Sequence, residues 1–174
     1  SVVLEDSVTI NRIISVHYFQ YMSDFSFPGE SHDFWELVCV DRGEIIAVAG
    51  DRQLALKKGN ILFHKPNEFH NVLTNGRISP SLVVIGFDCH SPCMKAFEDQ
   101  LMNVQDTEKE LLAKIIVEAR NTFDGRLDDP YQEKLVFLEK QASFGAPQLI
   151  RHYLEQLMIH LYRRYFSYPL PVRT

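Results

Sequence analysis

Hydrophobic and polar positions divide the chain into two halves near residue 95. Before that point, apolar residues come in short runs, and turns rich in glycine, asparagine and aspartate separate these runs. We expect strands over residues 13–21, 34–40, 45–48, 53–56, 61–63, 69–73 and 82–87. Strands that are this short and this regularly spaced predict a sandwich or a barrel.

Two of the expected strands are apolar on both faces, over residues 37–40 and 83–85. A strand with one face in water alternates apolar and polar residues, whereas a continuous apolar run is covered on both sides. We therefore expect the barrel interior on one side of these strands and helices on the other. Trp35 has the opposite parity to Glu36, so it is expected to pack outward, under the helices.

Beyond residue 95 the apolar positions follow the period of a helix. A capping-box sequence at residues 107–110 predicts the start of a first helix, with Thr107 as the N-cap residue. Its apolar stripe consists of Leu111, Leu112, Ile115, Ala119 and Phe123. Asp129 and Pro130 are typical of a second helix start, as an N-cap followed by proline in the first turn.

A third helix is expected to open at Pro147 and to run to about Tyr165. Its apolar pairs recur at four-residue steps, which gives a stripe wide enough to pack on the barrel and to offer an edge to a partner. This helix could pack only within its own chain, or it could also contact a second copy in a dimer. Its position near the end of the chain favours the dimer contact. We expect residues 1–97 to form the barrel and residues 98–174 a helical region packed on it, as one compact domain.

Composition narrows the class of protein. The 174 residues are 45% hydrophobic and 24% charged, as in ordinary globular domains. The net charge of −5 argues against binding of a nucleic-acid phosphate backbone by this chain. Three cysteines at wide spacing indicate a reducing, cytosolic setting, and the pair Cys89 and Cys93 is read as two thiols at a strand end. No run of 18 apolar residues and no signal peptide are found, so neither a membrane span nor secretion is expected.

Two histidines and a carboxylate fall within the strand-rich half: His32, Glu36 and His70. Such groups inside a small barrel are either metal ligands or the polar end of a ligand pocket. Four residues of straight strand span roughly 13 Å, so His32 and Glu36 can share a ligand only if the chain bends between them. No nucleophile elbow and no phosphate-binding glycine loop is present, and we assign no catalytic residue.

The spacing of these residues resembles the paired motifs of the cupin double-stranded β-helix. The first motif reads H-x3-E-x6-G from His32 to Gly43, and the second is Gly59-Asn60-Ile61 followed by P-x3-H, which ends at His70. Metal-binding cupins begin the first motif with H-x-H, and here Glu30 replaces the first histidine. The resemblance implies three ligands, His32, Glu36 and His70, with Glu30 as a possible fourth, a set that suits iron, manganese or zinc.

Longer segments resemble the sensor domains of AraC/XylS-type transcription regulators. They are residues 32–44, 58–70 and 82–87, within a similarity that runs from Tyr18 to Cys93. The resemblance implies a cupin-like jelly-roll barrel that binds a small effector, followed by about three helices that dimerise. A separate segment with two helix-turn-helix motifs, which would lie beyond Thr174, would bind DNA.

We therefore expect an effector-sensing and dimerisation domain of a bacterial regulator, without enzymatic activity and without a resident cofactor. Its expected ligand-binding residues are Glu30, His32, Glu36, His64 and His70. His64 is read as a pocket or a surface residue, because strand alternation does not require it to face the same side as His70. The alternative is a metal-dependent cupin enzyme, an isomerase or a dioxygenase, that acts on a small polar substrate through His32, Glu36 and His70.

Overall fold

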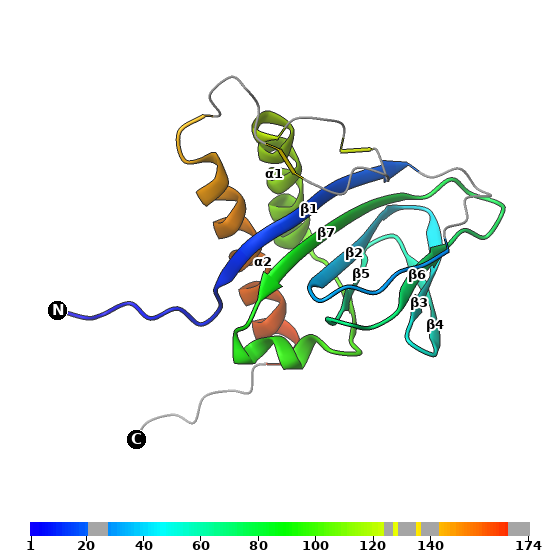
Figure 1. Cartoon of the computed structure of the whole chain (residues 1–174), viewed down its shortest axis with the longest axis horizontal. Coiled ribbons are helices and arrows are strands. Elements are labelled where there is room, and N and C mark those ends of the chain that lie inside the picture. The colour runs from blue at the N-terminus through cyan, green and yellow to red at the C-terminus, as the bar shows by residue number, and fades with distance from the viewer. Residues whose placement is uncertain (21–27, 124–126, 129–134, 137–142, 167–174) are drawn as a thin grey trace.

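The computed structural model describes residues 1–20, 28–123, 127–128, 135–136 and 143–166. Its strands are β1 (Ile10–Gln20), β2 (Trp35–Arg42), β3 (Glu44–Ala49), β4 (Arg52–Lys57), β5 (Asn60–His64), β6 (His70–Leu73), β7 (Ser81–Cys89) and β8 (Leu101–Asn103). The helices are the 3-10 helix η1 (Pro92–Phe97) and the α-helices α1 (Asp106–Thr122) and α2 (Ala146–Tyr165). Figure 1 shows both α-helices on one side of the strands.

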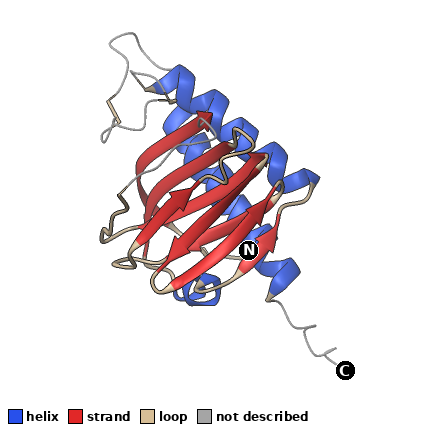
Figure 2. Ribbon diagram, turned by 90° about the vertical axis from the view of Figure 1, so that its right-hand side faces the viewer, coloured by secondary structure: helices blue, strands red, loops and turns tan. Residues whose placement is uncertain are grey.

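The strands form two antiparallel sheets that face each other. One has five strands in the order β1-β7-β2-β5-β8, and the other has three in the order β4-β3-β6. The helices cover the outer face of the five-stranded sheet (Figure 2). This arrangement confirms the mainly β class, a cupin-like jelly roll with C-terminal helices, and its strands form an open sandwich instead of a closed ring.

Two apolar cores hold the layers together, one on each face of the five-stranded sheet. Alternation along β7 sends Val83 and Ile85 into the core with the helices, while Val84 enters the core between the sheets. All residues of β7 are buried, so the expectation of a strand covered on both faces is confirmed. Trp35 lies in the helix-side core, as its parity predicts.

The first helix differs from its expectation at its start. The helix begins at Asp106 after Gln105, and no side chain caps it, so the capping box predicted with Thr107 is wrong. Glu108, the third residue of the helix, is not exposed to solvent. It is buried beneath the guanidinium of Arg164 from α2. The expected apolar stripe is buried, although its last residue, Phe123, follows the end of the helix.

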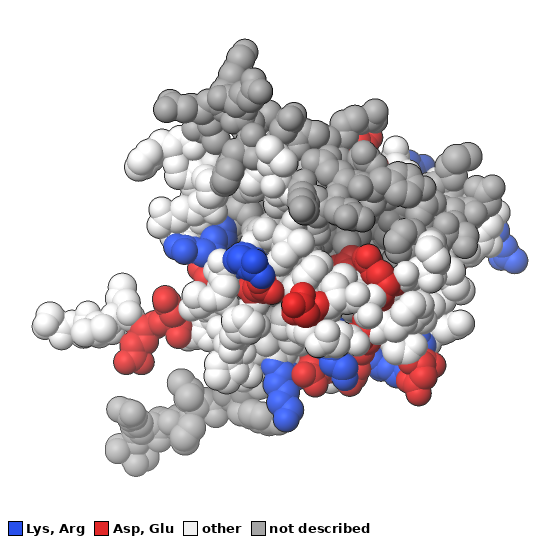
Figure 3. All heavy atoms as spheres, viewed as in Figure 1, with Lys and Arg blue, Asp and Glu red and all other residues white. Residues whose placement is uncertain are grey.

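The last helix is confirmed, with Pro147 in its first turn. It follows Gly145, whose φ of 77° lies in the left-handed region that favours glycine. The second helix, expected from Asp129 and Pro130, lies outside the described residues. No α-helix among those described is both long and apolar enough to cross a membrane. Basic and acidic side chains are interspersed on the face that Figure 3 displays.

Candidate functional site

The candidate site starts from Glu36, which β2 presents between the two sheets. Its neighbours Trp35 and Leu37 lie in the core under the helices, so alternation along the strand turns Glu36 inward. In the pairing of β2 with β5, Glu36 lies opposite His64. The sheet thus brings a carboxylate and an imidazole together on its inner face.

His32 reaches the same carboxylate because the chain bends before β2. Its Nε2 atom lies 2.9 Å from Oε2 of Glu36. The N–H group of Asn67 donates a hydrogen bond to the carbonyl oxygen of His32 at 2.6 Å. The imidazole also stacks on the ring of Phe34, with centroids 3.7 Å apart. The structure therefore contains the bend that a ligand shared by His32 and Glu36 requires.

His70 approaches Glu36 from the other sheet, at the start of β6. Its Nε2 atom lies 2.6 Å from Oε2 of Glu36. Backbone hydrogen bonds of 3.0 and 2.9 Å join Glu30 and His70 in both directions. They bring Oε1 of Glu30 to 3.6 Å from Nε2 of His70 and 3.9 Å from Nε2 of His32. Glu30, His32, Glu36 and His70 form what we call the His–Glu cluster.

Gly29 allows the chain to lie this close to β6. Its φ is +86°, and a Cβ atom at this position would lie 2.4 Å from the ring of Phe69 and 3.1 Å from the carbonyl oxygen of His70. A side chain here would both strain the backbone and displace the neighbouring segment. The glycine thus permits the backbone bridge between Glu30 and His70.

Both imidazoles of the cluster are oriented by the backbone. Nδ1 of His32 donates to the carbonyl oxygen of Phe34 and Nδ1 of His70 to that of Glu68, each at 3.0 Å. A carbonyl oxygen only accepts, so both protons sit on Nδ1 and both Nε2 lone pairs of the neutral rings face Glu36. Each ring therefore needs a second proton, or a metal ion, to meet the carboxylate favourably.

Charge in the cluster is strongly coupled. Burial opposes ionisation of Glu36, but its contacts with His32 and His70 outweigh burial and lower its pKa to about 2. Burial also opposes charge on His70, yet Glu30 and Glu36 raise its pKa to about 10. The 2.6 Å contact between Nε2 of His70 and Glu36 lacks the alignment of a hydrogen bond. The cluster thus attracts a positive charge at this point, whether a proton or a metal ion supplies it.

His64 lies beside the cluster, buried at 2% exposure. Its ring stacks on that of His70 with centroids 4.6 Å apart, although alternation left their sides undetermined. The two residues belong to different sheets, so parity along one strand cannot relate them. Nδ1 of His64 lies 3.4 Å from Oε1 of Glu68, and this hydrogen bond lowers the pKa of Glu68. The sequence interpretation missed Glu68, whose position four residues after His64 across the Pro66 turn was the available signal.

The donor atoms of the His–Glu cluster fit a divalent metal ion. Four such atoms lie within 4.8 Å of one another. Ligands around a tetrahedral ion with bonds of about 2.1 Å lie roughly 3.4 Å apart. The separations of 2.6, 2.9, 3.6 and 3.9 Å bracket that value. Hydrogen bonds from Nδ1 to backbone carbonyls are also usual for histidines that bind metals.

Comparison with known proteins shows which family this chain resembles. Residues 13–76 match the family model described as the AraC-like ligand binding domain. Two curated relatives, both named HTH-type transcriptional activator RhaS, come from Pectobacterium carotovorum and Pectobacterium atrosepticum. Each is 32% identical over 65 residues, which cover 37% of this chain and 23% of the relative. The chain thus aligns with about a quarter of the length of these relatives.

Solved structures extend the similarity to the fold of nearly the whole chain. Apo ToxT from Vibrio cholerae, as a single-residue variant, matches 94% of this chain and 58% of its own, with a TM-score of 0.51 and 11% identity. A cupin domain from Schizosaccharomyces pombe covers 42% of this chain and 50% of its own, with a TM-score of 0.38 and 12% identity. Residues 13–76 of this chain are therefore similar to the AraC-like ligand binding domain family, and the match to ToxT shows a shared fold.

Proposed function

We propose that this chain is the effector-sensing part of an AraC-type transcription regulator, and that the His–Glu cluster is the polar end of its effector site. One observation carries the proposal: Glu30, His32, Glu36 and His70 converge from separate segments on one point between the sheets. The side chain of Glu30 is 50% exposed, so this point is open to solvent. Imidazoles and carboxylates in one place suit a small hydroxylated or carboxylated molecule.

Binding at this point would act on both sheets. Glu36 belongs to the five-stranded sheet, and His70 to the three-stranded sheet, which the backbone bridge links to Glu30. An effector that favours one arrangement of these segments shifts the population toward it. In the full regulator, this shift would reorient a dimer formed through the C-terminal helices, and with it DNA-binding segments beyond Thr174. We propose this homodimer and a cytoplasmic location, together with DNA binding through that further segment alone.

An effector screen tests the proposed site. The whole chain is heated in the presence of monosaccharides, polyols and hydroxy acids, and unfolding is followed by fluorescence. A true effector is expected to raise the melting temperature of the wild type. It should not raise that of Glu36→Gln, which removes the charge at the centre of the cluster. Glu110→Gln, an exposed position on α1, is the matched control and should respond as the wild type does. An effector that stabilises Glu36→Gln as much as the wild type would place the site elsewhere.

The donor set of the His–Glu cluster favours a second candidate function, that of a metal-dependent cupin enzyme such as an isomerase or a dioxygenase. Iron, manganese or zinc held by His32, Glu36 and His70 would supply a Lewis acid or a redox centre to a small polar substrate. This candidate predicts near-stoichiometric metal in protein purified without chelators, measured by elemental mass spectrometry. Glu36→Gln is expected to lose most of that metal, and Glu110→Gln to keep it. Protein without metal, even after incubation with each ion, would exclude this candidate.

A further inference from the structure

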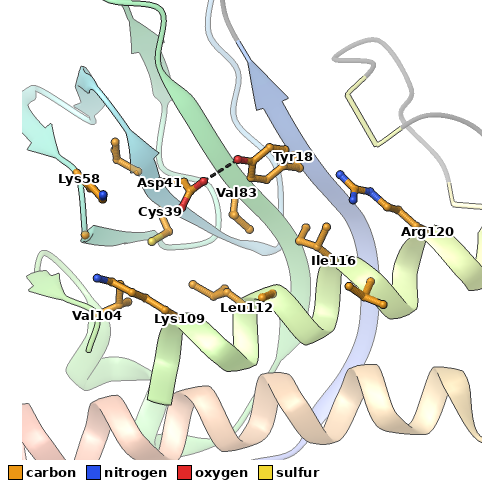
Figure 4. Close-up of a pocket in the computed structure, with 14 residues that line it drawn as sticks. Tyr18, Cys39, Asp41, Lys58, Val83, Val104, Lys109, Leu112, Ile116 and Arg120 are labelled. Atoms are coloured by element: carbon orange, nitrogen blue, oxygen red, sulfur yellow. Dashed lines mark hydrogen bonds between the residues drawn. The ribbon is translucent and has the colours of Figure 1, made fainter. Parts of the chain in front are cut away.

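A second pocket lies between the five-stranded sheet and α1 (Figure 4). It is partly open to solvent and has a volume of about 570 Å³, which is typical of sites for small organic molecules. Glu36 faces the interior of the sandwich, whereas this pocket lies on the helix-facing side of the same sheet. The sheet therefore separates the pocket from the His–Glu cluster, and binding here is independent of the function proposed above.

The floor of the pocket crosses three neighbouring strands. Tyr18 on β1 pairs with Val83 on β7, and Val83 pairs with Cys39 on β2. Val83 and Cys39 belong to the core shared with α1, so their side chains point toward the helix. Burial raises the pKa of the Cys39 thiol to about 12, so this thiol is a neutral part of the floor at physiological pH.

One face of α1 forms the opposite wall. Its lining residues recur at the spacing of successive helical turns. They are Lys109, Leu112, Ala113, Ile116, Val117 and Arg120. The middle of this wall is aliphatic, and charged side chains stand at its two ends (Figure 4). The pocket can therefore take an aliphatic body along α1.

Charge is distributed unevenly along the pocket. Its lining contains three cations, Lys58, Lys109 and Arg120, and one acid, Asp41. Tyr18 donates a hydrogen bond of 2.6 Å to Asp41. Figure 4 shows Arg120 at the end beside Tyr18, and the amines of Lys58 and Lys109 at the other end. Within the described part of the chain, neither amine forms an ion pair, and Figure 4 shows Asp41 between this end and Tyr18.

We propose that this pocket binds an organic anion with an aliphatic body, whose acid group lies at Lys58 and Lys109. The acid group meets a lining with three cations and one acid, and it contacts two amines that form no ion pair. The aliphatic body removes apolar wall from water. A cation would be repelled at this end, and a neutral polyol would leave the aliphatic wall unmatched. Arg120 contributes less, because Figure 4 shows it at the opposite end of the pocket from the two amines.

Octanoate is the probe for this proposal, and octan-1-ol is its neutral counterpart of equal length. Titration calorimetry on the whole chain is expected to show millimolar or tighter binding of octanoate. Higher salt should weaken the binding of octanoate but not that of octan-1-ol, because salt screens exposed charges and does not affect the burial of apolar surface in this way. No heat of binding with octanoate, or equal affinity for the two compounds at low salt, would overturn the proposal.

Matched variants locate the acid group. The double change Lys58→Gln and Lys109→Gln is expected to weaken octanoate about tenfold, as loss of two exposed charge contacts implies. Lys114→Gln, on another face of the same helix, should leave the affinity unchanged, and Arg120→Gln should change it less than twofold. Ala113→Phe fills the pocket from an exposed helix position, so it should abolish binding of both compounds without unfolding the protein. Octanoate that binds equally well to the double variant, or to Ala113→Phe, would overturn the proposal.

Discussion

At the scale of single residues, Glu36 shows how a buried carboxylate is kept charged in this fold. It sits on a strand whose other inward residues, Val38 and Val40, are apolar. An isolated carboxylate there would be costly, and it would take up a proton. Contacts with His32 and His70 offset the cost of burial, and both imidazoles are fixed by hydrogen bonds to backbone carbonyls. The cluster is therefore a preorganised binding site for a positive charge.

The charge on His70 predicts a pH dependence of stability in metal-free protein. The pKa of His70 is raised to about 10, above its ordinary value near 6.5. Its stabilising charge is therefore fully present below pH 6.5 and is lost as the pH rises through 10. We expect the free energy of unfolding to fall by a few kcal/mol over this interval, measured by urea denaturation after dialysis against a chelator.

His70→Gln is the control for this prediction, because other groups also titrate near pH 10. The variant should be less stable than the wild type at pH 6, and the difference should narrow toward pH 10. A difference between the two proteins that stays constant over this range would show that His70 is not charged in the folded protein.

At the scale of elements, an ion pair joins α1 to α2. Glu108 on α1 is 3% exposed and accepts hydrogen bonds from the guanidinium of Arg164 on α2. The same guanidinium donates to the carbonyl oxygen of Asn103 at the end of β8. One arginine thus holds together two helices and an edge strand, on the side of the sheet where the octanoate pocket is proposed.

Removal of Arg164 is expected to destabilise the protein strongly. Arg164→Met leaves Glu108 buried without its partner, which costs about 3 kcal/mol when a buried ion pair is broken on one side. Replacement of both residues, as Arg164→Met with Glu108→Leu, should recover much of this loss, since no charge then remains buried. Guanidinium denaturation of the three proteins checks the prediction. Equal stability of the single variant and the wild type would mean that Glu108 is solvated in solution.

The strands and the two described α-helices could be predicted from the sequence because each follows a regular apolar period. Strand β8 was missed because only Met102 of its three residues is buried, which is too short a pattern to detect. The start of α1 was misread because the spacing of Thr107 and Glu110 favoured a capping box, whereas the helix begins one residue earlier, at Asp106. The burial of Glu108 in the same turn depends on Arg164, 56 residues away, and no local pattern records such a contact.

The same limit applies to the candidate site. The motif spacing indicated His32, Glu36 and His70, and these residues do meet in the structure. The orientation of His64 could not be derived, because it depends on how the two sheets face each other. The pocket beneath α1 was not predicted either. Its walls come from β1, β2, β7 and α1, which the sequence separates by up to about a hundred residues.

At the scale of the whole molecule, the proposed homodimer needs an apolar surface at the C-terminal helices. Phe144 is fully exposed just before α2, and Leu149 is 37% exposed in its first turns. We expect the chain to be a dimer in sedimentation equilibrium and the double change Phe144→Ser with Leu149→Ser to shift it toward the monomer. Burial of such side chains in an interface contributes about 1.5–3 kcal/mol each.

Leu4→Ser is the matched control for the dimer. Leu4 is 92% exposed in the N-terminal segment before β1, so its loss removes a similar apolar side chain at another place. The control should sediment as the wild type does. A wild-type chain that sediments as a monomer at all concentrations, or a double variant that remains a dimer, would contradict a contact at the start of α2.

Strand β7 is hydrogen-bonded to β1 on one side and to β2 on the other, and both of its faces are covered. Water therefore reaches its backbone amides through neither an edge nor a face, and their hydrogens exchange with deuterium only when the whole domain opens. The exchange rate of these amide hydrogens therefore reports the free energy of global unfolding. A compound that binds between the sheets and one that binds beneath α1 would each slow this exchange, to an extent set by its concentration and its dissociation constant.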